Sequence, residues 1–395
     1  MTDLARIVHL ARALHLVRLA RPLPARPDTP DERPANTPDE RSGLAERLAQ
    51  RTLELVDIPS QSLHEAKVRA HLLSLVPPAF APEYAAEDAF VFARPRRPDV
   101  PLVLLVGHYD TVPAQDNLPG RIDDGAVHGC GATDMKGGVA VALEIVRELA
   151  VNEPGPVDVG LLLFGKEELP AQFSPLPDLF EQSRLAAAAD LAILLEPTDL
   201  TIQAGCLGNM SARISFSGVS GHSARPWTAE NAIEKAIAGL APIASLERRE
   251  AVVGGLSFYE VASITRFEAG IADNVIPDRA VATLNFRYAP DRTPESAAEY
   301  LRSLTPAGAD LEITGDSPPA TVVTDTPLVR ALRDAGDLTF EPKQAWTNVA
   351  DFTTRGIDAI NFGPGATRYA HRRDELVQID SLVTAYKTLL RFLTA

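Results

Sequence analysis

Short apolar runs alternate along this chain with segments that have the apolar spacing of helices. The runs expected to form buried strands are residues 102–106, 157–164, 191–195 and 359–362. Helical spacing appears at 135–150 and 328–335. Buried strands that alternate with helices are typical of a parallel sheet covered by helices. We therefore predict an α/β fold with a mixed, largely parallel sheet flanked by helices.

The pattern differs between about residues 206 and 316. There, three segments alternate apolar with polar residues, and two more are amphipathic helices. The alternating segments are 212–216, 263–267 and 281–286, and the helices are 230–246 and 294–304. Half-buried strands with helices on one face predict a small α+β domain inserted into the first one. Such an insertion creates a cleft between two bodies, which is a common location for a ligand site.

We accordingly divide the chain into a domain formed by 44–205 and 317–395, an inserted domain of 206–316, and an extension of 1–43. The extension contains a Pro-rich stretch in which Thr-Pro-Asp-Glu-Arg occurs twice and which has no apolar residues to bury. We expect it to be a disordered linker. The alternative is a basic amphipathic targeting or membrane-surface helix in residues 1–21, which carry four arginines and one acid.

The composition restricts the possible partners. The chain has 395 residues, 38 Lys+Arg against 53 Asp+Glu, and a formal net charge of −15, so its surface repels nucleic acid and anionic lipid. Its apolar runs fall short of the ~20 residues of a membrane helix. Two cysteines, Cys130 and Cys206, exclude a Cys-rich zinc site. We expect a cytoplasmic protein without a nucleic-acid or membrane partner, in which His and carboxylate side chains hold any metal.

Histidine and acidic residues follow the predicted strands where each strand ends. They are His108 and Asp110 after the first strand, Glu167 and Glu168 after the second, and Glu196 after the third. Asp134 lies in a Gly-rich turn just before a helix, and His371 follows the last strand. Because the carboxyl ends of parallel strands share one edge of a sheet, these groups can converge there.

Several carboxylates crowded at one edge require a compensating cation. Two imidazoles with carboxylates form a ligand set that zinc accepts, and cobalt or manganese as well. If one carboxylate bridges, two ions lie at the spacing that favours hydrolysis. Asp110 is placed to accept the second ring N–H of His108, and Glu167 to accept a proton from the attacking water.

Taken together, the motifs are similar to those of the co-catalytic dizinc aminoacylase and carboxypeptidase family, from about residue 53 to the C-terminus. The motifs are His108-Tyr-Asp110, Gly129 to Gly138, Glu167-Glu168, Glu196-Pro-Thr198, Gly221-His222-Ser223 and His371. The resemblance implies a zinc-peptidase-like catalytic domain with an inserted ferredoxin-like domain that acts as a lid and forms a homodimer.

The same resemblance implies a ligand set for two divalent ions, zinc being favoured. His108 and Glu196 would hold one ion, Glu168 and His371 would hold the other, and Asp134 would bridge them.

It also implies roles for residues that are not ligands. Glu167 would be the general base and then the acid, and Asp110 would orient His108. His222 would reach across the dimer interface to stabilise the oxyanion, because a developing negative charge favours a positioned N–H donor.

The chain also resembles the succinyl-diaminopimelate desuccinylase branch of this family in the segments 116–119, 274–277, 285–288, 346–349, 361–365 and 370–375. The expected reaction converts N-succinyl-LL-2,6-diaminopimelate and water to succinate and LL-2,6-diaminopimelate. The expected substrate contacts are Arg287 and Asn274, with Arg225 and Thr347 as further contacts. Asn348 stands where this branch often has an acid, which leaves open an N-acetylornithine or other N-acyl-amino-acid deacylase, or an exopeptidase. A non-catalytic ligand-binding relative and a two-metal phosphoesterase are the remaining alternatives.

Overall fold

The computed structural model describes residues 38–395. The first 37 residues of the predicted extension lie outside this range. Residues 38–43, at the end of the predicted extension, lie in the first turns of helix α2 (Pro38–Val56). Within the described residues, no helix is long and apolar enough to cross a membrane.

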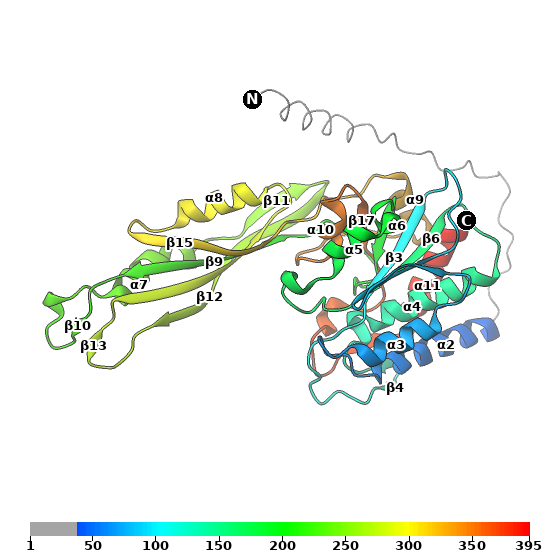
Figure 1. Cartoon of the computed structure of the whole chain (residues 1–395), viewed down its shortest axis with the longest axis horizontal. Helices are drawn as coiled ribbons and strands as arrows, with labels where there is room; N and C mark the ends of the chain where they lie inside the picture. Colours follow the sequence, from blue (N-terminus) through cyan, green and yellow to red (C-terminus); the bar gives the residue numbers. More distant parts are fainter. Residues whose placement is uncertain (1–37) are drawn as a thin grey trace, which may run out of the picture.

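An eight-stranded sheet forms the larger of two bodies (Figure 1). In order across the sheet, its strands are β1 (Ala81–Ala85), β2 (Ala89–Ala93), β6 (Asp158–Phe164), β3 (Leu102–His108), β7 (Leu191–Leu194), β17 (Asp358–Asn361), β8 (Ile202–Ala204) and β16 (Phe340–Pro342). The four central strands β6, β3, β7 and β17 are parallel, and β1, β2 and β8 add antiparallel pairs. The four strands predicted from the sequence are these four, and the mixed, largely parallel sheet is confirmed.

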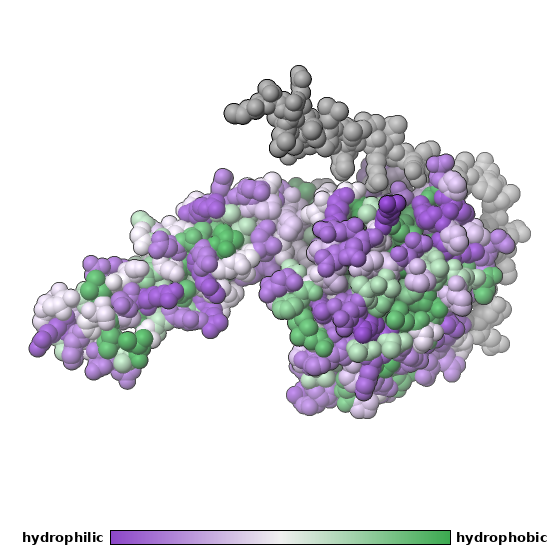
Figure 2. Space-filling view, viewed as in Figure 1, coloured by the Kyte–Doolittle hydropathy of each residue, from purple (hydrophilic) through white to green (hydrophobic). Residues whose placement is uncertain are grey.

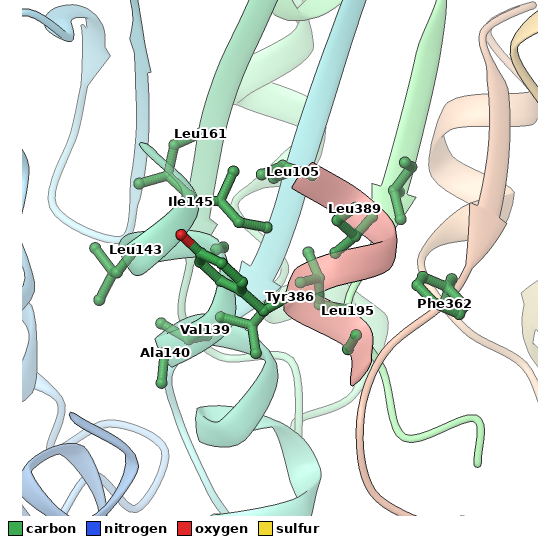
Figure 3. Packing of buried hydrophobic residues seen from close by; sticks show 14 of the residues in the cluster. Leu105, Val139, Ala140, Leu143, Ile145, Leu161, Leu195, Phe362, Tyr386 and Leu389 are labelled. Carbon is green, nitrogen blue, oxygen red and sulfur yellow. The ribbon is translucent and has the colours of Figure 1, made fainter. Parts of the chain in front are cut away.

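Helices cover both faces of this sheet because its central strands are apolar on both sides. One face carries α2, α3 (Ala66–Leu75), α4 (Gly137–Val151), α9 (Pro327–Gly336) and α11 (Ile379–Thr394), and the other carries α5 (Leu176–Gln182), α6 (Arg184–Ala187) and α10 (Val349–Thr353). Figure 3 shows the first face, where Val139 of α4, Leu105 of β3 and Tyr386 of α11 pack together. Burial of these side chains fixes the strand ends that carry the polar residues.

A second, five-stranded antiparallel sheet extends away from the first body (Figure 1). Its order is β11 (Arg249–Val253), β12 (Leu256–Ala269), β14 (Arg279–Tyr288), β9 (Gly208–Ser217) and β15 (Ala309–Ser317). The helices α7 (Ala232–Ala244) and α8 (Pro294–Leu304) pack on one face. Their N-termini are capped by the side chains of Asn231 and Thr293.

The connectivity of this body is β9–α7–β12–β14–α8–β15, with β11 added at the edge. It is the βαββαβ arrangement of the predicted ferredoxin-like fold. The predicted boundary at 206 lies two residues before β9, and the boundary at 316 lies inside β15, one residue before its end. The division into domains stays a prediction.

Two small sheets complete the described chain. One pairs β10 (Gly221–His222) with β13 (Val275–Ile276), in the connections that leave β9 and β12 at the far end of the second sheet (Figure 1). The other joins β18 (Leu376–Gln378), β5 (Ala126–His128) and β4 (Arg121–Asp123). On the face seen in Figure 2, hydrophilic residues predominate and apolar residues form small separate patches.

Candidate active site

Three neighbouring parallel strands deliver acidic and histidine side chains to one edge of the larger sheet. His108 is the last residue of β3, Glu167 and Glu168 follow β6, and Glu196 follows β7. Because β6, β3 and β7 are adjacent and parallel, their carboxyl ends meet at the same edge, as the sequence predicted.

Two further segments bring Asp134 and His371 to this edge. Asp134 lies in the turn Ala132–Lys136, directly before α4, and its own backbone is extended, with φ −124° and ψ 94°. His371 follows the short 3₁₀ turn Thr367–Tyr369 and has a positive φ of 59°. A positive φ is uncommon for a residue other than glycine and is often found at functional sites.

The side chains form two groups that share Asp134. His108, Asp134 and Glu196 form one group, and Asp134, Glu168 and His371 form the other, with the ligand atoms of each group within 4.8 Å of one another. The two histidines contact different oxygens of Asp134. His108 Nε2 lies 3.2 Å from Asp134 Oδ1, and His371 Nε2 lies 3.4 Å from Asp134 Oδ2. Asp134 is therefore the only residue common to both groups among residues 38–395.

The two remaining carboxylates flank the imidazoles closely. Glu168 Oε1 lies 2.9 Å from His371 Nε2, and Glu196 Oε1 lies 4.0 Å from His108 Nε2. Glu167 belongs to neither group, but its Oε2 lies 4.0 Å from His108 Nε2. A carboxylate beside the groups and outside them is free to exchange a proton with a molecule bound there.

Asp110 faces His108 with its backbone oxygen as well as with the carboxylate that the sequence pointed to. His108 Nδ1 lies 3.1 Å from the backbone oxygen of Asp110 and 3.5 Å from Oδ1 of the Asp110 carboxylate. A carbonyl oxygen only accepts hydrogen bonds, so Nδ1 carries the proton and Nε2 is left to face Asp134.

The Asp110 carboxylate has a further task that the sequence did not indicate. It accepts hydrogen bonds from the Ser62 hydroxyl at 2.7 Å and from the backbone N–H groups of Glu167 and Glu168 at 3.0 and 3.2 Å. The buried Asp110 therefore fixes the turn that presents both glutamates.

Burial and mutual repulsion oppose the ionisation of these acids. Burial raises the pKa of Glu167 well above its ordinary value, and burial with the neighbouring Asp134 raises the pKa of Glu196 to about 7. Hydrogen bonds to Asp134 and Glu168 raise the pKa of His371 to about 10. Burial alone would lower the pKa of His108, but Asp110 and Asp134 raise it well above its ordinary value.

The donor set fits a pair of divalent cations. The carboxylates draw protons onto both imidazoles, which means that the site favours positive charge between its acids. Each group offers one imidazole and two carboxylates, which zinc, cobalt and manganese accept. A divalent cation held between these acids supplies the positive charge that compensates them, without the need for protons on the imidazoles.

Two glycines allow the backbone to close around Glu196. A Cβ added at Gly138 would lie 2.2 Å from the Leu195 backbone oxygen, and one at Gly363 would lie 2.4 Å from the same atom. Only glycine permits so close an approach, so α4 and the turn after β17 clamp the peptide before Glu196 from two sides.

Three of the predicted residues lie far from these groups within one chain. His222 belongs to β10, and Ser223 donates a backbone hydrogen bond to the Asn274 carbonyl, so His222 and Asn274 are neighbours. The backbone N–H of Arg225 donates to the His222 carbonyl. Figure 1 shows β10 and β13 at the end of the second sheet that is remote from the larger body. We call this segment, residues 219–231 with 270–277, the tip.

The other two predicted contacts lie where the two sheets meet. Arg287 is near the end of β14, and its Nε donates to Asn285 Oδ1 at 3.0 Å. Thr347 is buried before α10, and its carbonyl accepts a hydrogen bond from Cys206, which precedes β9. The buried side-chain oxygens Thr347 Oγ1 and Asn348 Oδ1 have no hydrogen-bond partner within residues 38–395.

Sequence reasoning assigned no role to two buried charged residues. Lys343, 6% exposed, forms no ion pair or hydrogen bond with any residue from 38 to 395, and its charge lowers the pKa of Glu196 against the effect of burial. Glu375 accepts backbone hydrogen bonds from the loop that carries Asp134. The motif around His371 contains Glu375, but only the folded loop shows which donors it meets.

Comparisons with known proteins agree with this geometry. The profile of "Peptidase family M20/M25/M40" matches residues 104–395. The chain is 37% identical over 345 residues to a Mycobacterium tuberculosis protein provisionally named succinyl-diaminopimelate desuccinylase DapE, covering 87% of this chain and 96% of that protein. It is 35% identical over 356 residues to the succinyl-diaminopimelate desuccinylase of Corynebacterium glutamicum, covering 87% and 95%.

The fold is also that of a solved structure. The aminopeptidase PepT of Bacillus cereus superposes with a TM-score of 0.73 at 17% identity, covering 88% of this chain and 98% of that one. The similarity confirms the predicted fold, and the family match confirms the resemblance inferred from the motifs. The chain belongs to peptidase family M20/M25/M40.

Proposed function

We propose that the protein is a dinuclear metal-dependent amidohydrolase that converts N-succinyl-LL-2,6-diaminopimelate and water to succinate and LL-2,6-diaminopimelate. The observation that carries the proposal is the pair of His and carboxylate groups that share Asp134, with Glu167 beside them. Two relatives that align along 87% of the chain bear the name of this activity.

His108 and Glu196 would hold one ion, Glu168 and His371 the other, and Asp134 both. The two ions supply the positive charge that makes a water molecule acidic and stabilises negative charge on the amide oxygen. We favour zinc, with cobalt or manganese as alternatives, because all three accept imidazole and carboxylate ligands.

Glu167 would transfer the proton. The carboxylate removes a proton from the attacking water while the water oxygen bonds to the amide carbon, and it returns that proton to the nitrogen as the C–N bond breaks. Burial raises the pKa of Glu167, which suits a group that must first accept a proton and then give it back. Asp110 would keep the Glu167 turn and the His108 tautomer fixed through both steps.

His222 would stabilise the oxyanion from a second copy of the chain. Support comes from the distance between the tip and the metal groups in one chain (Figure 1) and from the exposed apolar residues of the tip, Trp227 at 78% and Ile271 at 87%. A homodimer that exchanges tips would bring His222 to the neighbouring site and cover these side chains.

Recognition of the substrate's carboxylates would fall to cationic and polar side chains. Arg287 and Thr347 at the junction of the sheets, with the buried Lys343, would bind one carboxylate, since an arginine fork matches its two oxygens. Asn274 and Arg225 would add contacts from the partner's tip. We retain a cytoplasmic location as a prediction from the sequence.

The proposal is tested with a panel of succinylated and acetylated amino acids. Purified protein loaded with zinc is expected to hydrolyse succinyl-diaminopimelate with the highest kcat/KM. A preference for N-acetylornithine or for a dipeptide would change the assigned substrate and leave the assigned reaction, metal-dependent amide hydrolysis, unchanged. Stoichiometric binding without turnover of any amide would contradict the enzymatic function.

A further inference from the structure

Glu375 is buried under the loop that carries the shared ligand. Its side chain is 2% exposed and lies four residues after His371. One carboxylate oxygen accepts the N–H of Gly131 at 3.0 Å, and the other accepts those of Thr133 and Asp134 at 3.0 and 3.1 Å. Three backbone donors therefore converge on a single side chain, and one of them belongs to Asp134.

Backbone contacts attach the same segment to the same loop. The Gly129 N–H donates to the Glu375 carbonyl at 3.0 Å, and β18, which begins at the next residue, pairs with β5 just before the loop. On the outer side, Gln115 Nε2 donates to the His371 carbonyl at 2.9 Å. Residues 371–375 thus contact Asp134 twice, with the His371 ring at its carboxylate and with Glu375 at its backbone N–H.

We propose that Glu375 is a positioning residue for both metal ions, because its carboxylate holds the 131–134 loop in the conformation in which Asp134 faces His108 and His371 together. The proposal rests on the metal-binding part of the proposed function and is independent of the substrate. Only a carboxylate meets the requirement, since it offers acceptors on both oxygens. An amide of the same shape replaces one acceptor with a donor, which would face at least one backbone N–H.

The test compares Glu375→Gln with a matched control, Glu260→Gln. Glu260 is 3% exposed, accepts hydrogen bonds from Arg249, Arg292 and the Ala289 N–H, and lies in the second sheet. Both substitutions remove a buried carboxylate with several donors, so both are expected to lower the melting temperature. Only Glu375→Gln is expected to change the metal site.

Metal-stripped, folded protein is titrated with Zn²⁺ by calorimetry and with Co²⁺ by visible absorption, and amide hydrogen exchange is followed across 129–136. For Glu375→Gln we expect both ions to bind about 10- to 100-fold more weakly. We also expect an altered Co²⁺ spectrum and faster exchange of the loop amides. Glu260→Gln should leave all three readouts at wild-type values.

Wild-type affinity for both ions and a wild-type Co²⁺ spectrum in Glu375→Gln would overturn the proposal, as would an equal loss of affinity in Glu260→Gln. If Glu375→Gln does not fold, Glu375→Asp decides. It keeps the charge but withdraws the oxygens by one methylene, so intermediate affinities are expected and wild-type affinities would overturn the proposal. None of these readouts requires turnover, so an incorrect substrate assignment would leave them unchanged.

Discussion

The rim of the eight-stranded sheet and the tip of the five-stranded sheet hold their functional side chains differently. The rim is the sheet edge that carries His108, Asp110, Asp134, Glu167, Glu168, Glu196 and His371. At the rim, His108 and Asp110 are fully buried and their polar atoms contact Asp134, Ser62 and backbone N–H groups. At the tip, His222 is exposed and its ring Nδ1 accepts a hydrogen bond from the Ala224 N–H.

The contrast separates two kinds of site. The rim is preorganised within one chain, because hydrogen bonds and ion pairs hold its side chains before any ligand arrives and His108 and Asp110 are also buried. At the tip, His222 is exposed and, within the described residues, is held only by local backbone contacts, and the apolar side chains of Trp227 and Ile271 are exposed beside it.

The largest effect is expected from Glu167→Gln at the rim. Because the amide cannot accept the proton of water, kcat should fall by about 10² to 10⁴, while the content of bound metal stays at the wild-type value. Steady-state kinetics with elemental analysis measures both. The exposed Glu181 serves as a control, because Glu181→Gln removes the same charge from the surface. Wild-type turnover in Glu167→Gln would refute the assignment.

The next effect distinguishes the tip from the rim. His222→Ala should lower kcat by about 10² to 10³, since it removes one oxyanion donor. When equal amounts of His222→Ala and Glu167→Gln proteins are mixed and allowed to exchange subunits, activity should return to about a quarter of wild type. About half of the dimers are then mixed, and one of the two sites in each mixed dimer has both residues. No recovery after proven exchange would mean that His222 acts within its own chain or not at all.

A smaller effect concerns pH and metal affinity at the rim. Burial raises the pKa of Glu196 to about 7, so the folded metal-free protein binds this proton more tightly than the unfolded chain does. The resulting contribution to folding stability is greatest at low pH and is lost as the pH rises through 7. Metal binds the ionised carboxylate of Glu196, so the Zn²⁺ affinity should fall as the pH is lowered. We expect a loss of about tenfold per pH unit for each proton that the metal displaces, and the steepest loss below pH 7. Titrations at pH 6, 7 and 8 measure the slope. An affinity independent of pH would contradict the proposed ligands.

The smallest effect tests recognition at the junction of the sheets. Arg287→Lys should raise KM for a succinylated substrate about tenfold, with little change for an acetylated one, because lysine lacks the bidentate fork. Arg279→Lys is the matched control, since Arg279 begins the same strand and is exposed. Equal losses for both substrates would show that Arg287 does not bind the succinyl carboxylate.

The rim could be predicted from the sequence because it depends on regular structure. Buried strands 102–106, 157–164 and 191–195 lie side by side in the order β6, β3, β7, and a parallel sheet must then place His108, Glu168 and Glu196 at one edge. The antiparallel strands β1, β2 and β8 were not predicted. Strands β1 and β8 have no continuous apolar run, whereas the buried apolar run of β2, Ala89–Ala93, is a strand signal that the prediction missed.

The contacts that support the rim could not be predicted either. Glu375 accepts a hydrogen bond from the N–H of Asp134, which is 241 residues away in the sequence, and the pairing of β18 with β5 brings the two segments together. Lys343 is buried by tertiary packing beside an unremarkable edge strand. The position of His222 follows from the length of the second sheet, which the motif Gly221-His222-Ser223 does not encode.

The shared role of Asp134 is tested by the number of divalent ions that the protein binds. Calorimetric titration of metal-stripped protein with Zn²⁺ should give two ions per chain for the wild type. Asp134→Asn should weaken both binding events, because the two groups share this residue, whereas Glu196→Gln should weaken one. Full activity in rigorously metal-free protein, or an Asp134→Asn variant that still binds two ions tightly, would contradict the account.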